Sequence, residues 1–215
     1  MTNNPARPPR YAVAVEIPPG YHELPLTGIA TAISAADPLL SQQTTGTLRE
    51  SVPKTLGTLE FMLEALAKRN AVYCGIGTHR SADGHPVVSW LTISCLDAGA
   101  PRNPRLTLAD IAQHKTRDEI GWRVEGVDVG ERPLLFSEGI GHYPYPGLPA
   151  LRKSDDAAHA YQMEAVIPSP DGTTVAVVEV ATAEVDRGPE FGPMLFGMAA
   201  SLEFVSSSTT TSLDL

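Results

Sequence analysis

The residues best suited to metal chemistry lie close together in one short segment. His79, Asp83 and His85 supply two imidazoles and a carboxylate, which are ligands that zinc or iron accepts. Asp83-Gly84 is also a typical hairpin turn, and neighbouring turn residues seldom converge on one metal without a fourth ligand from elsewhere. The turn interpretation is therefore favoured. We expect no cofactor and no bound metal, and these three residues remain the candidates if one exists.

Nucleophilic and acid–base catalysis have less support in the sequence. Ser137 lies inside a predicted strand and not in a Gly-x-Ser-x-Gly turn, and Cys74 and His79 are spaced to face opposite sides of a strand. The acidic residues between positions 119 and 138 are typical of the solvated face of a sheet. We identify no catalytic residue, and the sequence favours a protein that is not an enzyme.

A proline-stiffened aromatic loop is the clearest candidate for contact with a partner. Residues 141–154 contain HYPYPGLP, which places His142, Tyr143 and Tyr145 among prolines. Such a loop can present rings to a partner at low entropic cost, although the tyrosines could equally fold back over the edge of a sheet. Trp122 and Arg123, on a predicted strand, extend this candidate surface.

Four segments have the patterns of helices that could position these residues. The strongest is 53–69, where apolar residues recur at intervals of three and four and mark one helical face. A short helix is expected within 27–47 and another over 107–114, with Thr107 as its N-cap. The last is expected over 189–201.

Six extended segments form three predicted hairpins, and shorter extended pieces flank them. The hairpins are 71–79 with 86–96, 121–129 with 133–140, and 161–167 with 174–185. We predict an α+β fold in which an antiparallel twisted sheet of about six strands carries packed helices, as an α-β-α sandwich. Helices 53–69 and 189–201 are expected to cover its apolar side. Residues 11–206 are expected to form a single domain between a flexible arm, 1–10, and a flexible tail, 207–215.

Composition limits the classes of partner and the cellular location. The formal charge of −9 is scattered along the chain, which disfavours broad contact with nucleic acid, and the apolar runs are too short for membrane insertion. The polar start argues against a secretory signal. Cys74 and Cys95 lie in apolar runs and are expected to be reduced core thiols, which fits a cytoplasmic protein.

The order of elements resembles the PsbP-like fold, which is shared by the photosystem II extrinsic subunit, the Ran-binding Mog family and LpqN-type lipoproteins. Two stretches carry the resemblance, VEIPPGYHELPL near the start and EFGPMLFGMAASLEF near the end. The resemblance implies an α-β-α sandwich and an accessory binding or assembly role without catalysis. The chain lacks a lipobox cysteine near its start, and the 141–154 loop has no counterpart in the pattern.

Three hypotheses about function follow from these observations. The first is a non-catalytic accessory protein that binds a protein partner through the loop and a sheet surface. The second is a small-molecule-binding protein or an enzyme with a pocket between helix 53–69 and the sheet. The third is a homo-oligomeric scaffold that associates through sheet edges.

Overall fold

The computed structural model describes residues 10–118, 121–143 and 158–206. The predicted arm, except for Arg10, and the predicted tail lie outside the described residues. So does most of the aromatic loop, including Tyr145. No helix in the three described ranges is both long and apolar enough to cross a membrane.

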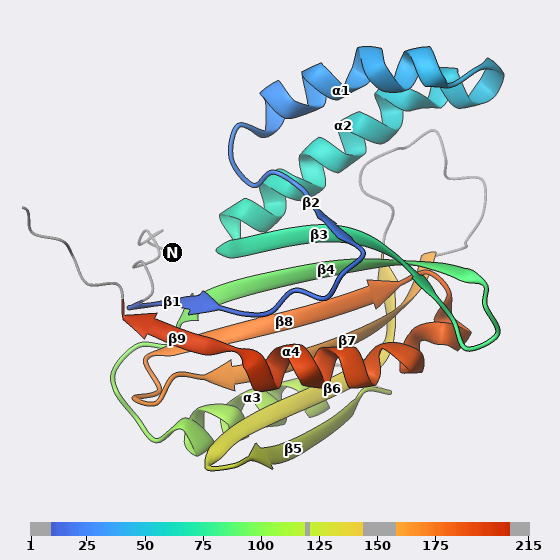
Figure 1. Cartoon of the computed structure of the whole chain (residues 1–215). Helices are drawn as coiled ribbons and strands as arrows, with labels where there is room; N and C mark the ends of the chain where they lie inside the picture. Colours follow the sequence, from blue (N-terminus) through green and yellow to red (C-terminus); the bar gives the residue numbers. More distant parts are fainter. Residues whose placement is uncertain (1–9, 119–120, 144–157, 207–215) are drawn as a thin grey trace, which may run out of the picture.

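The fold is α+β, as predicted, with an antiparallel sheet of seven strands in the order β2-β3-β4-β8-β7-β6-β5 (Figure 1). The six predicted strands are all present, and a short segment at one edge is the seventh. Two further strands, β1 and β9, pair with each other near the chain ends. The strands are β1 (Tyr11–Ala14), β2 (Tyr21–Glu23), β3 (Ala71–Arg80), β4 (Pro86–Asp97), β5 (Arg123–Val129), β6 (Arg132–Tyr143), β7 (Ala158–Pro168), β8 (Thr174–Thr182) and β9 (Glu203–Ser206).

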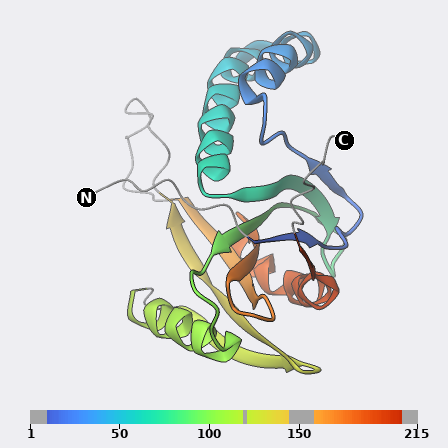
Figure 2. The same cartoon turned by 90° about the vertical axis from the view of Figure 1, so that its left-hand side faces the viewer.

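Helices cover both faces of the sheet. Helix α3 (Pro104–Asp118) lies on one face, while the 3₁₀ segment η2 (Val185–Phe191) and helix α4 (Gly192–Ser201) lie on the other (Figure 2). The larger core cluster joins Leu195 and Met198 of α4 to the inward side chains of β4, β6, β7 and β8. A smaller cluster forms where Leu108 of α3 meets Leu135 and Val166. Alternating strand residues thus supply two apolar layers, one beneath each helix.

The predicted roof formed by helix 53–69 is wrong. Helix α2 runs over Gly46–Lys68 and forms a hairpin with α1 (Ile29–Gln43), which projects beyond the β3 side of the sheet (Figures 1 and 2). Helix α2 buries Val52, Leu56 and Leu63, and none of these residues belongs to either core cluster. The predicted apolar face of the helix exists, but the elements that pack against it are mainly α1 and β3. Periodicity identifies a buried face without identifying what buries it.

Helix starts also differ from the prediction. Helix α3 begins at Pro104, so Thr107 lies within the helix and does not cap it. The side chain of Asn103 caps the helix instead, because its Oδ1 accepts a hydrogen bond from the backbone N–H of Arg105 at 2.9 Å. Proline is compatible with the first turn because its missing N–H has no helical partner there. The Asn-Pro pair was therefore the better start signal.

Candidate partner-binding edge at strand β5

Strand β5 is the outermost strand of the seven-stranded sheet on the side away from β3. It pairs antiparallel with β6, from Arg123 opposite Glu138 to Val129 opposite Arg132. Among the described residues, no strand pairs with its other side. The left-handed Gly130, with φ of 62°, closes a two-residue turn between the strands.

This turn decides which backbone groups of β5 face away from β6. Val129 and Arg132 are the closing pair of the hairpin, so the odd-numbered residues of β5 exchange hydrogen bonds with β6. The N–H and C=O groups of Val124, Gly126 and Asp128 consequently point to the open edge. An open row of this kind is a template for another strand.

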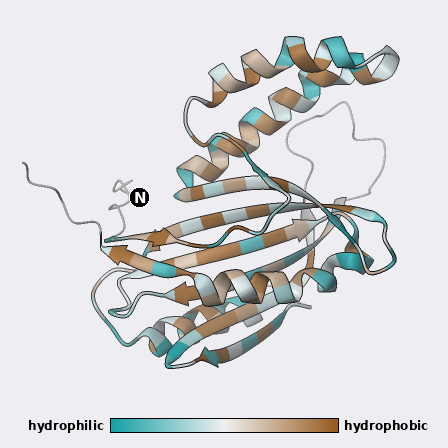
Figure 3. Cartoon of the chain, viewed as in Figure 1, coloured by the Kyte–Doolittle hydropathy of each residue, from teal (hydrophilic) through white to brown (hydrophobic). Residues whose placement is uncertain are grey.

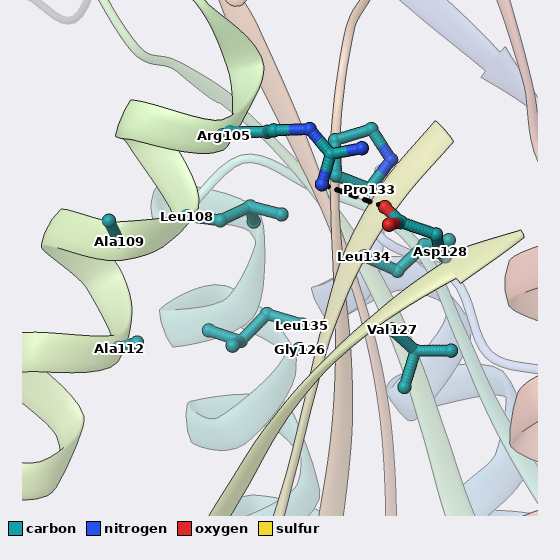
Figure 4. Close-up of a pocket in the computed structure, with 10 residues that line it drawn as sticks. All are labelled: Arg105, Leu108, Ala109, Ala112, Gly126, Val127, Asp128, Pro133, Leu134 and Leu135. Carbon is teal, nitrogen blue, oxygen red and sulfur yellow. Dashed lines mark ion pairs between the residues drawn. The ribbon is translucent and has the colours of Figure 1, made fainter. Parts of the chain in front are cut away.

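A cavity of about 330 Å³ lies beside β5 on the side of α3. Figure 4 shows Leu108 of α3 and Leu135 of β6 between the helix and the strands, with Arg105 reaching toward Asp128 of β5. The guanidinium of Arg105 and the carboxylate of Asp128 form an ion pair at 2.9 Å. Gly126 leaves the space above the strand empty, since a Cβ there would meet no atom within 4 Å.

A second cavity, of about 240 Å³, lies on the opposite face of the same strand, toward α4. Phe136 of β6 and Phe196 of α4 stack there with ring centroids 5.9 Å apart, and Phe196 is 45% exposed. Val127 and Met163 add further apolar surface. The two cavities thus flank one strand, which matches the alternation of side chains along an added strand.

The rim of the second cavity carries more acidic than basic side chains. Arg123 reaches two carboxylates, Glu125 at 3.0 Å and Glu138 at 3.5 Å. Glu138 also accepts a hydrogen bond from the Tyr161 hydroxyl at 2.8 Å. Burial, together with that hydrogen bond, raises the pKa of Tyr161 to about 12, so the hydroxyl stays protonated and remains a donor. One cation among two carboxylates leaves a net negative rim.

Trp122 and Arg123, predicted to share a binding surface, lie on opposite sides of the sheet. Arg123 is exposed at the cavity on the α4 side, whereas Trp122 lies over Gly139 on the α3 side. The ammonium of Lys115 sits 4.9 Å from the centroid of the indole ring. Trp122 therefore covers the sheet and steadies α3, and Arg123 alone borders the site.

His142 and Tyr143 extend the sheet as the last residues of β6. Their backbones pair with His159 and Ala158 of β7, which corrects the prediction that the loop begins at 141. Tyr145 lies outside the described residues. The contribution of this aromatic segment to binding therefore stays a prediction.

The structure does not bring the three metal candidates together. The ring of His79 packs against Tyr21 and Phe191, with centroids 4.8 and 5.4 Å apart, and burial lowers its pKa. The carboxylate of Asp83 forms an ion pair with Arg187, while His85 is exposed. Within the described ranges no group of three His, Cys, Asp or Glu side chains is placed to hold a metal ion.

A buried charged cluster that sequence reasoning missed anchors α3 to the sheet. The ammonium of Lys115 lies 2.6 Å from the carboxylate of Glu164, and both side chains are nearly buried. Glu179, opposite Glu164 on β8, accepts a hydrogen bond from Gln162. Burial and the neighbouring Glu164 raise the pKa of Glu179 to about 7. The sequence did contain one indication of this cluster, because Glu179 interrupts the otherwise apolar run TVAVVEVAT.

Both cysteines are free and buried, in agreement with the prediction of core thiols. Burial raises the pKa of Cys74 to about 12 and that of Cys95 to about 11. Neither sulfur is therefore an available thiolate near neutral pH.

Comparison with known proteins adds no assignment, because neither a family model nor a curated protein matches this sequence.

Proposed function

We propose that this chain is an accessory protein-binding module that takes an extended segment of a partner protein as an additional strand beside β5. The observation that carries the proposal is a strand edge that no other described strand covers, with a cavity on each face of the strand. Backbone hydrogen bonds to the edge would supply affinity, and alternate side chains entering the two cavities would supply selectivity.

The cavities define the chemistry of the segment. The stacked rings of Phe136 and Phe196 suit a large apolar side chain, and the neighbouring Glu125 and Glu138 suit a lysine or arginine beside it. The cavity on the α3 side is bordered by Leu108, Gly126 and the paired Arg105 and Asp128, which suits an uncharged apolar side chain. An apolar segment with basic flanks therefore fits best.

To test the proposal, a library of displayed random peptides of about twelve residues is selected for binding to the full chain. The affinity of each selected peptide is then measured by calorimetry. We expect apolar residues at alternate positions, with a basic residue nearby. Gly126→Pro should weaken binding at least about tenfold, because it removes an outward N–H and places a ring at the edge. Gly126 donates no hydrogen bond to β6, so the hairpin should persist.

Gly126→Ala is the matched control. It keeps the N–H and adds a methyl group to open space on the α3 side, so it tests the cavity without removing the edge hydrogen bond. Selected peptides that bind Gly126→Pro as tightly as the unmodified chain would show that the site lies elsewhere. Circular dichroism melting of each variant separates loss of binding from loss of fold.

The resemblance to the PsbP-like group supports the same class of role, since its members act mainly as accessory binding proteins. We also propose a cytoplasmic location. The free, buried thiols of Cys74 and Cys95 support a reducing compartment.

A further inference from the structure

Among the described residues, the α1–α2 hairpin is only weakly covered by other elements. Helix α1 contains no buried residue, and it packs mainly on α2. Helix α2 in turn reaches the sheet at β3. Figure 1 shows the two antiparallel helices standing off the sheet, and Figure 3 shows hydrophobic residues recurring along both.

Large apolar side chains of this hairpin are open to solvent. Leu39 is 60% exposed, Leu48 is 66% exposed and Phe61 is 61% exposed. Leu40 and Met62 are less exposed neighbours. Leu39 and Leu48 lie near the turn between the two helices, and Phe61 lies further along α2, so exposed apolar area is spread along one projecting element. Exposed apolar area on such an element is typical of an interaction surface, whereas single exposed residues scattered over a protein are ordinary.

Charge indicates what covers this surface. Between residues 29 and 68 three basic residues stand against four acidic ones, so the hairpin has a formal charge of only −1 while the whole chain carries −9. Helix α1 contains a single charged residue, Asp37, whose carboxylate accepts a hydrogen bond from the Ser41 hydroxyl at 3.1 Å. The remainder of the chain therefore carries −8 of the formal charge of −9.

That distribution favours a second copy over a charged partner. Two identical chains that met through any strongly acidic face would repel each other, whereas their nearly neutral hairpins can meet with little of that penalty. A basic partner would be attracted to the rest of the chain and would gain nothing electrostatically from the hairpin. Two antiparallel hairpins can also pack as a four-helix bundle around a twofold axis.

We infer that two copies of this chain associate through their α1–α2 hairpins. The hairpin lies beside β3, at the end of the strand order opposite β5. Association through the hairpins therefore leaves both β5 edges open. This inference is independent of the proposed function of β5, and if both hold, the dimer presents two strand-binding sites to one partner.

Sedimentation equilibrium of the full chain tests the inference over a hundredfold range of concentration. We expect a species of twice the chain mass of 22.9 kDa. Leu39→Glu and Phe61→Glu should each raise the dissociation constant at least about tenfold, because they place carboxylates in an apolar contact. Val205→Glu changes a comparably exposed apolar residue on β9, outside the hairpin, and should leave association unchanged.

Introduced cysteines give a second, independent measurement. The native thiols are buried, so a bismaleimide should react selectively with Leu39→Cys, Leu48→Cys or Phe61→Cys. At least one of these variants should crosslink into dimers faster than Val205→Cys. A chain that stays monomeric throughout, dimers unaffected by the two glutamate variants, or faster crosslinking at position 205 would each overturn the inference. Unchanged melting of the variants confirms that they remain folded.

Discussion

Arg105 at the start of α3 and Asp128 of β5 form an ion pair with 2.9 Å between guanidinium nitrogen and carboxylate oxygen, at the mouth of a cavity of about 330 Å³. The pair ties a helix to the outermost strand of the sheet. Each side chain remains at least half exposed, so the pair guides local geometry more than it stabilises the fold.

A double-mutant cycle on this pair should therefore give a small coupling energy. We expect Arg105→Ala and Asp128→Ala to couple by less than about 1 kcal/mol in the free energy of unfolding, since water screens both charges. Urea denaturation of the four proteins measures the coupling. A coupling of several kcal/mol would show that the pair is desolvated in solution and would contradict the exposed geometry.

Glu179 should make stability depend on pH. Its pKa is raised from 4.5 to about 7 in the folded chain, so the folded state holds this proton more tightly than the unfolded state does. The contribution of this group is most favourable below about pH 4.5 and is lost as pH rises through 7. Glu179→Gln should therefore gain stability relative to the unmodified chain as pH rises, by up to about 3 kcal/mol at pH 8.

Chemical denaturation at pH 5 and at pH 8 measures this difference. The gain from Glu179→Gln should be small at pH 5 and larger at pH 8. An equal gain at both values would show that packing, and not ionisation, explains the effect of the substitution.

Gly139 is expected to tolerate no side chain while Trp122 lies over it. A Cβ at position 139 would come within 2.8 Å of the indole ring, so Gly139→Ala forces the ring to move. We expect a loss of about 1–3 kcal/mol in the free energy of unfolding. In a Trp122→Ala background the same substitution should cost much less, because the obstacle is gone. Equal costs in both backgrounds would indicate that the strand backbone is responsible.

The two possible caps of α3 give opposite predictions. Asn103→Ala should lose about 1 kcal/mol in the free energy of unfolding, because the hydrogen bond to the N–H of Arg105 is lost. Thr107→Val should be neutral or stabilising, since the Thr107 hydroxyl is buried without a hydrogen-bond partner among the described residues. Thermal melts of the two variants compare them directly. If Thr107→Val lost more stability than Asn103→Ala, Thr107 and not Asn103 would be the residue that caps the helix.

The fold class, the six main strands and their three hairpins were all predictable from the order of residues along the chain. Those features depend on contacts between near neighbours: alternating apolar residues fix which side of a strand is buried, and Asp83-Gly84 or Asp171-Gly172 fixes a tight turn. The same local rules also indicated that Cys74 and Cys95 are core residues.

What covers each face of the sheet, and which distant residues meet, became visible in the folded arrangement alone. The apolar stripe of α2 could have covered the middle of the sheet, but it packs mainly on α1 and reaches the sheet at β3, next to the edge strand β2. Adjacent Trp122 and Arg123 were separated by the sheet, whereas Lys115, Glu164 and Glu179 were brought together from α3, β7 and β8. The site at β5 depends on strand order, which long-range pairing sets and no local pattern encodes.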